Sequence, residues 1–338
     1  MLALAVTVIT LPAAAASSSL SYVRVNGIRV RIAEQGKGPL VLMIHGFPES
    51  WYSWRHQLRA LAAAGYRAVA PDMRGYGGTD APAEVEAYDI LDLCGDVTGL
   101  LDALGEEKAV LVGHDWGAVV AWYCALLEPA RFTALVAMSV PWGPRADGPP
   151  LPRLRRLYGE NFFYMLYFQE PGVAEAELDA DPRGLLSRFF TAPDTPREPP
   201  RITDPRANAG GLIGRLGAPR ELPPWLSQED LDYYVAEFTR SGFRGGLNYY
   251  RNLDRNWELT PQLEGARITV PTLFIAGERD PVIGGRDKAG LERPMRLVAP
   301  DLRGVKLIAG AGHWIQQERA DEINGLLIQF LQSGEEGR

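Results

Sequence analysis

Apolar residues occur along much of the chain in short continuous runs, and these runs alternate with longer stretches that have helical spacing. Residues 40–44, 109–112 and 269–276 are runs of this kind, whereas residues 51–64 and 89–104 have helical spacing. Strands of a parallel sheet are buried on both faces and therefore read as continuous apolar runs, with helices connecting them. The alternation predicts an α/β fold with a mostly parallel central sheet and helices on both faces.

The remaining elements of this sheet are predicted from the same two patterns. Residues 23–32 alternate as a strand pair interrupted by Asn26 and Gly27, a dipeptide that favours a tight hairpin. Gly105 is expected to end the helix over residues 89–104. We expect further strands over residues 66–70, 132–140 and 304–308, and further helices over residues 118–127 and 321–331.

The pattern changes in the middle of the chain, from residue 142 to about residue 255. Prolines and glycines there separate short aromatic helical segments such as residues 161–168 and 230–240. We interpret this stretch as an inserted helical cap, and we expect its middle, residues 193–224, to form a long, partly mobile loop. The predicted domains are a first core part at residues 21–141, the cap at residues 142–255 and a second core part at residues 256–336.

Composition limits the classes of function. The 338 residues are 46% hydrophobic and 23% charged, with a net charge of -7, which is ordinary for a soluble globular protein and lacks the basic excess that nucleic-acid binding needs. The four histidines are dispersed without metal-ligand spacing, so we expect no metal and no other cofactor. Cys94 and Cys124 are expected to be buried free thiols. The sequence leaves open whether the protein is a monomer or a homo-oligomer.

The N-terminal residues 1–19 form a separate compositional feature. An apolar run over residues 2–11 is followed by Pro12, alanines and serines, as in an export signal, but no basic residue precedes it. The run is too short to span a bilayer, so we expect no stable membrane insertion. Export with cleavage of this segment and a cytoplasmic protein whose start is truncated or misassigned both remain open.

The chemistry is indicated first by residues 113–117, Gly-His-Asp-Trp-Gly, which lie directly between a predicted strand and a predicted helix. Small residues on both sides of so sharp a turn let strand and helix approach, and the turn presents its central side chain from a strained backbone. This is a nucleophile elbow with Asp115 at its centre, and a carboxylate can attack carbon to form an ester. The alternative, that Asp115 only caps the following helix, does not account for the two glycines.

Two later residues supply the expected partners of Asp115. Asp280 and His313 each follow a predicted strand, at the sheet edge where open α/β sheets build their sites. The chain order of nucleophile, acid and histidine is that of the α/β-hydrolase triad, so we expect His313 to act as a base that Asp280 orients. The backbone N–H groups of Phe47 and Trp116 are the expected oxyanion donors.

Six segments of the chain resemble the soluble epoxide hydrolase family, and the resemblance extends from about residue 21 to the C-terminus. They are residues 45–54 (HGFPESWYSW), 72–80 (DMRGYGGTD), 113–118 (GHDWGA), 167–175 (YFQEPGVAE), 241–250 (SGFRGGLNYY) and 312–316 (GHWIQ). The two cap segments are the most specific, since the first and third segments also occur in other hydrolases. The resemblance implies an α/β-hydrolase core with a helical cap that hydrolyses an epoxide to a vicinal diol through an aspartyl ester.

The resemblance also implies that two cap tyrosines hold the epoxide oxygen. Tyr250 matches the second of them. For the first, helical spacing does not choose between Tyr164 and Tyr167, and the position before Gln-Glu-Pro-Gly favours Tyr164. Neutral phenols can donate to an alkoxide, although aromatic packing is the alternative role for each ring. Met165 stands where vertebrate soluble enzymes have Gln, and Tyr249 stands in place of Trp. The expected substrate-binding residues are Phe47, Trp116, Tyr164, Met165, Tyr249, Tyr250 and Trp314.

Two other functions are compatible with parts of this pattern. A dehalogenase uses the same Asp, His and Asp but needs donors to a halide; haloalkane dehalogenases typically have Asn at the position of Phe47, and fluoroacetate dehalogenases use a cap histidine that this chain lacks. A non-catalytic ligand receptor on the same fold would not need all three catalytic residue types. The expected partners are a small apolar epoxide and water, not nucleic acid.

Overall fold

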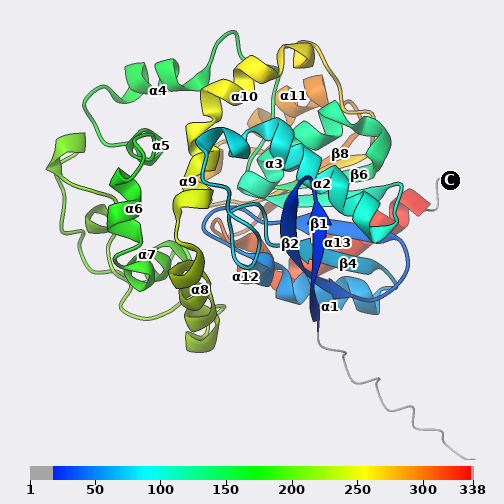
Figure 1. The fold of residues 1–338 in the computed structure, drawn as a ribbon, viewed down its shortest axis with the longest axis horizontal. Coiled ribbons are helices and arrows are strands. Elements are labelled where there is room, and N and C mark those ends of the chain that lie inside the picture. The colour runs from blue at the N-terminus through cyan, green and yellow to red at the C-terminus, as the bar shows by residue number, and fades with distance from the viewer. Residues whose placement is uncertain (1–17, 336–338) are drawn as a thin grey trace, which may run out of the picture.

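The computed structural model describes residues 18–335 and contains one eight-stranded sheet with the strand order β1-β2-β4-β3-β5-β6-β7-β8 (Figure 1). β1 pairs antiparallel with β2, and β2 pairs antiparallel with β4, while every other neighbouring pair is parallel. The predicted α/β class with a mostly parallel sheet is confirmed. The strands are β1 (Ser19–Val25), β2 (Ile28–Gln35), β3 (Leu40–Ile44), β4 (Arg67–Pro71), β5 (Ala109–His114), β6 (Phe132–Met138), β7 (Thr272–Gly277) and β8 (Leu302–Ile308).

Helices cover both faces of this sheet because its central strands are apolar on both sides. Within β3, Leu42 and Ile44 belong to one buried cluster, and Val41 and Met43 belong to another on the opposite face. The first cluster includes side chains of α2 (Ile90–Leu104), α3 (Trp116–Leu127) and α11 (Lys288–Val298), and the second includes side chains of α1 (Arg55–Ala63) and α13 (Ala320–Glu335). The sheet is therefore the middle layer of three.

Local sequence signals set several element boundaries where they were predicted. Asn26 and Gly27 have φ values of 45° and 78°, as the tight hairpin between β1 and β2 requires. Asp89 caps α2 by accepting hydrogen bonds from the N–H groups of Leu91 and Asp92. Gly105, with a φ of 75°, ends the same helix.

The chain between β6 and β7 forms the helices α4 to α10, several of which lie to one side of the sheet in Figure 1. They are α4 (Pro150–Tyr158), α5 (Tyr164–Tyr167), α6 (Val173–Leu178), α7 (Pro182–Phe189), α8 (Gln228–Ser241), α9 (Arg244–Arg251) and α10 (Leu253–Leu259). The division into core and cap stays a prediction, and its boundary at residue 255 falls inside α10. The remaining short helices are α12 (Ile315–Glu318) and the 3-10 helices Trp51–Trp54, Val85–Tyr88, Pro129–Arg131, Ala207–Ala209, Ile213–Arg215, Pro261–Leu263 and Pro281–Ile283.

Two of the differences between the structure and the sequence-based elements concern α5 and α11. The helix predicted over residues 161–168 is reduced to α5, because the N–H of Phe162 donates to the carbonyl of Pro205, 2.7 Å away, and the chain before α5 is extended. α11 was not predicted, and it contains Pro294, which usually argues against a helix interior. The predicted export-like segment lies outside the described residues, apart from its last two positions.

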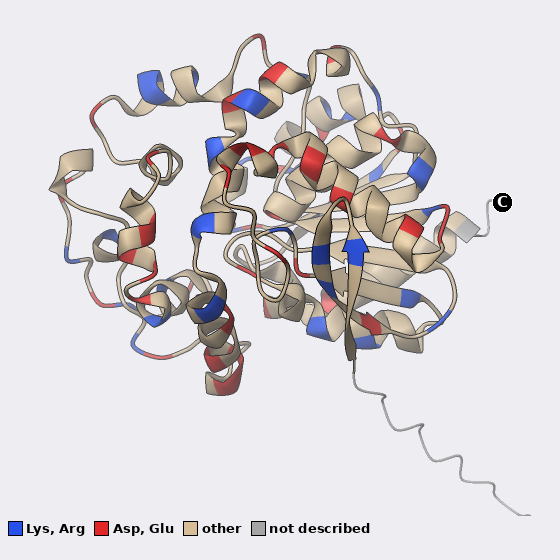
Figure 2. Ribbon diagram, viewed as in Figure 1, with Lys and Arg blue, Asp and Glu red and all other residues tan. Residues whose placement is uncertain are grey.

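Acidic and basic residues are scattered over the elements of residues 18–335 (Figure 2). None of the described helices combines the length and the apolar character that a membrane span requires. Both cysteines are buried free thiols, as expected.

Candidate active site

Asp115 lies at the turn between β5 and α3 with φ 53° and ψ −121°, a strained conformation for a residue with a side chain. The flanking glycines are needed for close approach. A Cβ on Gly113 would lie 2.2 Å from the carbonyl oxygen of Gly117, and one on Gly117 would lie 2.1 Å from that of Ile44. The turn thus has the geometry of a nucleophile elbow.

Each oxygen of the Asp115 carboxylate has a different neighbour. The N–H of Phe47 donates to Oδ1 at 2.9 Å, and Nε2 of His313 lies 3.5 Å from Oδ2. The Phe47 loop approaches so closely that a Cβ on Gly46 would lie 2.4 Å from Oδ1. Trp116 is the first residue of α3, so its N–H is one of the donors that the helix itself leaves unpaired. The carboxylate therefore lies beside the backbone N–H of Phe47 on one side and an imidazole on the other.

His313 and Asp280 form a buried pair. Nδ1 of His313 lies 3.1 Å and 3.0 Å from the two carboxylate oxygens of Asp280. Burial lowers the pKa of His313, but the charges of Asp280 and Asp115 outweigh this effect and raise the pKa well above 6.5. Burial acts to raise the pKa of Asp280, and His313 reverses this, so the pKa is lowered overall. Both shifts favour an imidazolium paired with a carboxylate.

Tyr164 and Tyr250 line the same cavity as Asp115, and their ring centroids are 5.8 Å apart. Burial, and after it the charge of Asp115, raises the pKa of both phenols above 10. The two hydroxyl groups therefore stay neutral at neutral pH and are able to donate. Tyr167, the alternative to Tyr164, instead donates to Glu177 at 2.9 Å and is absent from the cavity lining.

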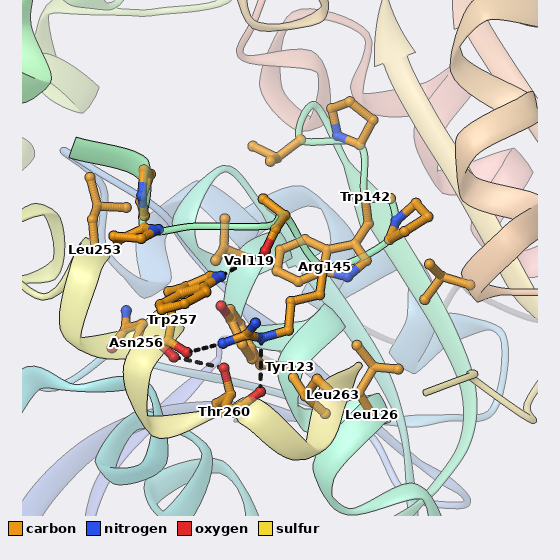
Figure 3. Close-up of a pocket in the computed structure, with 18 of the residues that line it drawn as sticks. Val119, Tyr123, Leu126, Trp142, Arg145, Leu253, Asn256, Trp257, Thr260 and Leu263 are labelled. Atoms are coloured by element: carbon orange, nitrogen blue, oxygen red, sulfur yellow. Dashed lines mark hydrogen bonds between the residues drawn. The ribbon is translucent and has the colours of Figure 1, made fainter. Parts of the chain in front are cut away.

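The cavity has a volume of about 840 Å³, and Asp115 is part of its lining. Trp142 and Arg145 of the loop after β6 and Trp257 of α10 also line it (Figure 3). Among the predicted substrate-binding residues, those that line it are Trp116, Tyr164, Met165 and Tyr250. Phe47 contributes its amide to Asp115, and its ring packs against Tyr250 at 5.6 Å.

Two predicted substrate-binding residues lie elsewhere. The hydroxyl of Tyr249 is buried and donates to the carbonyl of Arg74 at 3.0 Å, and the ring packs against Trp116. The indole N–H of Trp314 donates to the carbonyl of Phe189 at 2.8 Å. Neither side chain lines the cavity, and the Trp314 ring packs edge-on against the ring of His313, with the centroids 4.6 Å apart.

Glu49 and His114 adjoin the site, although the sequence analysis assigned them no role. Nδ1 of His114 lies 2.8 Å from Glu49, and Nε2 lies 2.8 Å from the carbonyl oxygen of His313. Burial acts to raise the pKa of Glu49, but His114 and other neighbours lower it to about 2, so Glu49 is ionised. Each nitrogen of His114 thus lies at hydrogen-bond distance from an acceptor, so the ring connects Glu49 to the backbone of His313. The sequence signal was their position within the two segments that also contain Phe47 and Asp115.

Comparisons with known proteins agree with this geometry. The family model of the alpha/beta hydrolase fold matches residues 39–179. "Epoxide hydrolase A" of Mycobacterium tuberculosis is 51% identical over 90% of this chain and 95% of its own length, and "Epoxide hydrolase 1" of Siraitia grosvenorii is 45% identical over 92% and 97%. The crystal structure of Epoxide Hydrolase A from Mycobacterium thermoresistibile superposes with a TM-score of 0.85 at 52% identity, covering 93% of this chain and 98% of that one.

These relatives decide between the functions that the sequence left open. They are named as epoxide hydrolases, at identities of 45–52% over most of both chains, and not as dehalogenases or receptors. The chain therefore belongs to the epoxide hydrolase family of the α/β-hydrolase fold, and it is an epoxide hydrolase.

Proposed function

We propose that the protein hydrolyses an epoxide to a vicinal diol through a covalent ester on Asp115. In the first half-reaction a carboxylate oxygen of Asp115 attacks a ring carbon, and the bond between that carbon and the epoxide oxygen breaks. The released alkoxide takes a proton from Tyr164 or Tyr250. Both phenols are neutral and line the cavity with Asp115, which supports this role.

Formation of the ester would also prepare His313 for the second half-reaction. The charge of Asp115 is one of the causes that raise the pKa of His313, and the ester carries no charge. The pKa of His313 therefore falls when the ester forms, and the imidazolium releases a proton that restores the phenol. The neutral imidazole, held by Asp280, can then accept a proton from water.

The second half-reaction breaks the ester at its carbonyl. Water, as it gives its proton to His313, attacks the carbonyl carbon of Asp115, and the oxyanion that forms accepts hydrogen bonds from the N–H groups of Phe47 and Trp116. The contact of Phe47 N–H with Oδ1 supports this assignment. Collapse of this intermediate breaks the bond between the carboxyl carbon and the alkoxy oxygen, and the departing alkoxide takes the proton of the hydroxyl that came from water. This step gives the diol and restores the Asp115 carboxylate. Protons balance over the cycle.

One observation carries the proposal: a single carboxylate, on a strained turn, lies between a backbone donor, an imidazole and a cavity with two phenols. The apolar residues that line most of this cavity favour an apolar epoxide.

A single-turnover experiment in water labelled with ¹⁸O tests the ester. Because the second half-reaction places an oxygen of water on Asp115, peptide mass spectrometry should find the label in the peptide that contains this residue. Label found only in the diol after one turnover would exclude the ester pathway.

The variant His313→Gln tests the same step by trapping. It should form the ester but fail to hydrolyse it, so intact-protein mass spectrometry after brief exposure to styrene oxide should show the mass of one bound substrate. The double variant Asp115→Ala, His313→Gln is the matched control and should show no added mass. An equal adduct in both variants would place the reaction on another residue.

A further inference from the structure

Glu318 is a buried glutamate beside the loop of His313, and the proposed reaction does not use it. It is the last residue of α12, and it is 9% exposed. Its side chain turns back toward the loop, where Oε2 accepts from the N–H of Gly312 at 2.8 Å and Oε1 accepts from the N–H of Trp314 at 2.9 Å. These two residues directly precede and follow His313. One carboxyl group therefore holds the backbone on both sides of the imidazole.

The two amides that Glu318 holds have no alternative acceptor. Both hydrogen bonds are buried, and within residues 18–335 the N–H groups of Gly312 and Trp314 make no other hydrogen bond. A buried N–H group without an acceptor is unfavourable, so a chain that lost these bonds would move to find new ones. The conformation of the backbone around His313 thus depends on Glu318.

The opposite side of this backbone is held from the core. The carbonyl oxygen of His313 accepts from the hydroxyl of Ser139 at 3.2 Å, and it lies 2.8 Å from Nε2 of His114. These contacts hold the carbonyl, whereas Glu318 holds the amides before and after it. The backbone that carries the imidazole is consequently fixed from two directions.

The stability of α12 does not account for a carboxyl group at this position. An acidic side chain in the last turn of a helix lies near the negative end of the helix dipole, which is unfavourable. Burial also raises the pKa of Glu318, although both amides and the charge of His313 act to lower it. Residues that break such local rules are expected mainly at functional sites.

We propose that Glu318 is a positioning residue for His313 in the hydrolysis of the ester. The imidazole must meet two carboxyl groups at once, with Nδ1 3.0 Å from Asp280 and Nε2 3.5 Å from Asp115. A displacement of about 1 Å at such a site can cost about 10²-fold in rate. The role belongs to the second half-reaction, because His313 accepts a proton from water only there. The inference rests on the proposed function, in which His313 is the base.

Rapid-quench kinetics of Glu318→Gln with styrene oxide tests the proposal. Gln has one acceptor oxygen, and its NH₂ group would face the second backbone N–H. The rate constant for ester hydrolysis should fall by about 10-fold to 100-fold, and that for ester formation should change by less than about threefold, because attack by Asp115 needs no proton transfer to His313. Intact-protein mass spectrometry of the quenched samples follows the rise and the decay of the ester.

Glu318→Asp is a second variant that keeps the charge and both oxygens. Its side chain is shorter by one carbon, so it should also slow ester hydrolysis selectively. It provides the same comparison of the two rate constants if Glu318→Gln does not fold, which circular dichroism determines.

Glu278→Gln is the matched control. Glu278 is exposed, and its Oε2 accepts from the N–H of Gly310 in the same loop at 3.2 Å, but Gly310 does not adjoin His313. Both rate constants should stay within about twofold of the wild type in this variant. An equal fall of both rate constants in Glu318→Gln would make Glu318 a support of the fold alone, and unchanged ester hydrolysis in that variant would also overturn the inference.

His313→Gln separates this inference from the proposed function. If His313→Gln accumulates the ester while Glu318→Gln hydrolyses it as fast as the wild type, the proposed function stands and the positioning role fails. If His313→Gln hydrolyses the ester at the wild-type rate, His313 is not the base, and the role of Glu318 fails with it.

Discussion

At the scale of single residues, the charge state of the site depends on groups that act on one another. His313 lies between the carboxylates of Asp280 and Asp115, and both raise its pKa. Only one of these carboxylates would lose its charge during the proposed reaction. Asp280 thus keeps His313 oriented, while Asp115 changes the affinity of His313 for a proton.

Asp280→Asn should lower kcat for styrene oxide by about 10²-fold to 10⁴-fold, because the amide no longer fixes the tautomer or stabilises the imidazolium. The amount of diol formed in reactions stopped at set times measures kcat directly. Asp301→Asn is the control, because Asp301 pairs with Arg303 on the surface. This substitution should leave kcat unchanged. A loss smaller than about tenfold in Asp280→Asn would contradict the role assigned to this carboxylate.

Gly113→Ala should destabilise the fold as well as the site. The added methyl group would meet backbone atoms of Gly117 and Ala118 at 2.2–2.7 Å, so β5 and α3 must move apart, at a cost of at least about 2 kcal/mol in the free energy of unfolding. Urea unfolding measures this cost. Gly325→Ala, in α13 with open space around the Cβ, should instead raise stability by up to about 1 kcal/mol. Equal effects at the two positions would show that the turn tolerates a side chain.

At the scale of elements, the sequence best predicts those strands, helices and turns that a single local pattern determines. The central strands are continuous apolar runs, and the hairpin at Asn26 and Gly27 needs only a local backbone preference. The helices between β6 and β7 are short and interrupted by prolines, so their periodicity is weak. The helix predicted from residue 161 begins later, because the N–H of Phe162 donates to the carbonyl of Pro205, which is distant in sequence.

The same distinction applies to the site. Asp115, Asp280 and His313 follow strands at one sheet edge, so topology alone brings them together. The positions of Tyr249 and Arg145 depend instead on hydrogen bonds to Arg74, Trp257 and Thr260, which no local pattern reveals. Sequence therefore predicts the reacting groups, whereas the shape and charge of the cavity require the packed structure.

The helix α1 carries a group whose ionisation should affect stability. Burial and, after it, the charge of Arg55 lower the pKa of His56 to about 4. In the unfolded chain this pKa is near 6.5, so between these values the unfolded state binds a proton that the folded state does not. His56 therefore makes the fold less stable as the pH falls through this window.

His56→Gln should remove this pH-dependent contribution to stability. Between about pH 7 and about pH 5 its melting temperature should fall less than that of the wild type, and thermal denaturation followed by circular dichroism measures the difference. Parallel curves for the two proteins would mean that His56 has the same pKa in the folded and unfolded states.

At the scale of the whole molecule, Arg31 links the sheet to the segment between β6 and β7. It comes from β2 and pairs with Asp72, which follows β4, and with Glu237 of α8. All three side chains are at most 11% exposed. A charge buried in this way is costly when one partner is removed.

Glu237→Gln should lower the free energy of unfolding by about 1.5–3 kcal/mol, because Arg31 loses a charged acceptor although it keeps its pair with Asp72. Asp232→Asn is the control on the same helix, because Asp232 pairs with Arg183 at the surface and should change stability by less than about 1 kcal/mol. Urea denaturation compares the two. Similar small losses would mean that water enters readily between α8 and the sheet.

The buried link through Arg31 also determines the direction from which a substrate arrives. Movement of α8 away from the sheet would separate opposite charges in a dry environment, while the far end of the cavity is bordered by exposed residues such as Leu297, which is 60% exposed. We therefore expect the substrate to enter past these exposed residues while α8 stays against the sheet, so that the epoxide reaches Asp115 without any buried ion pair being broken.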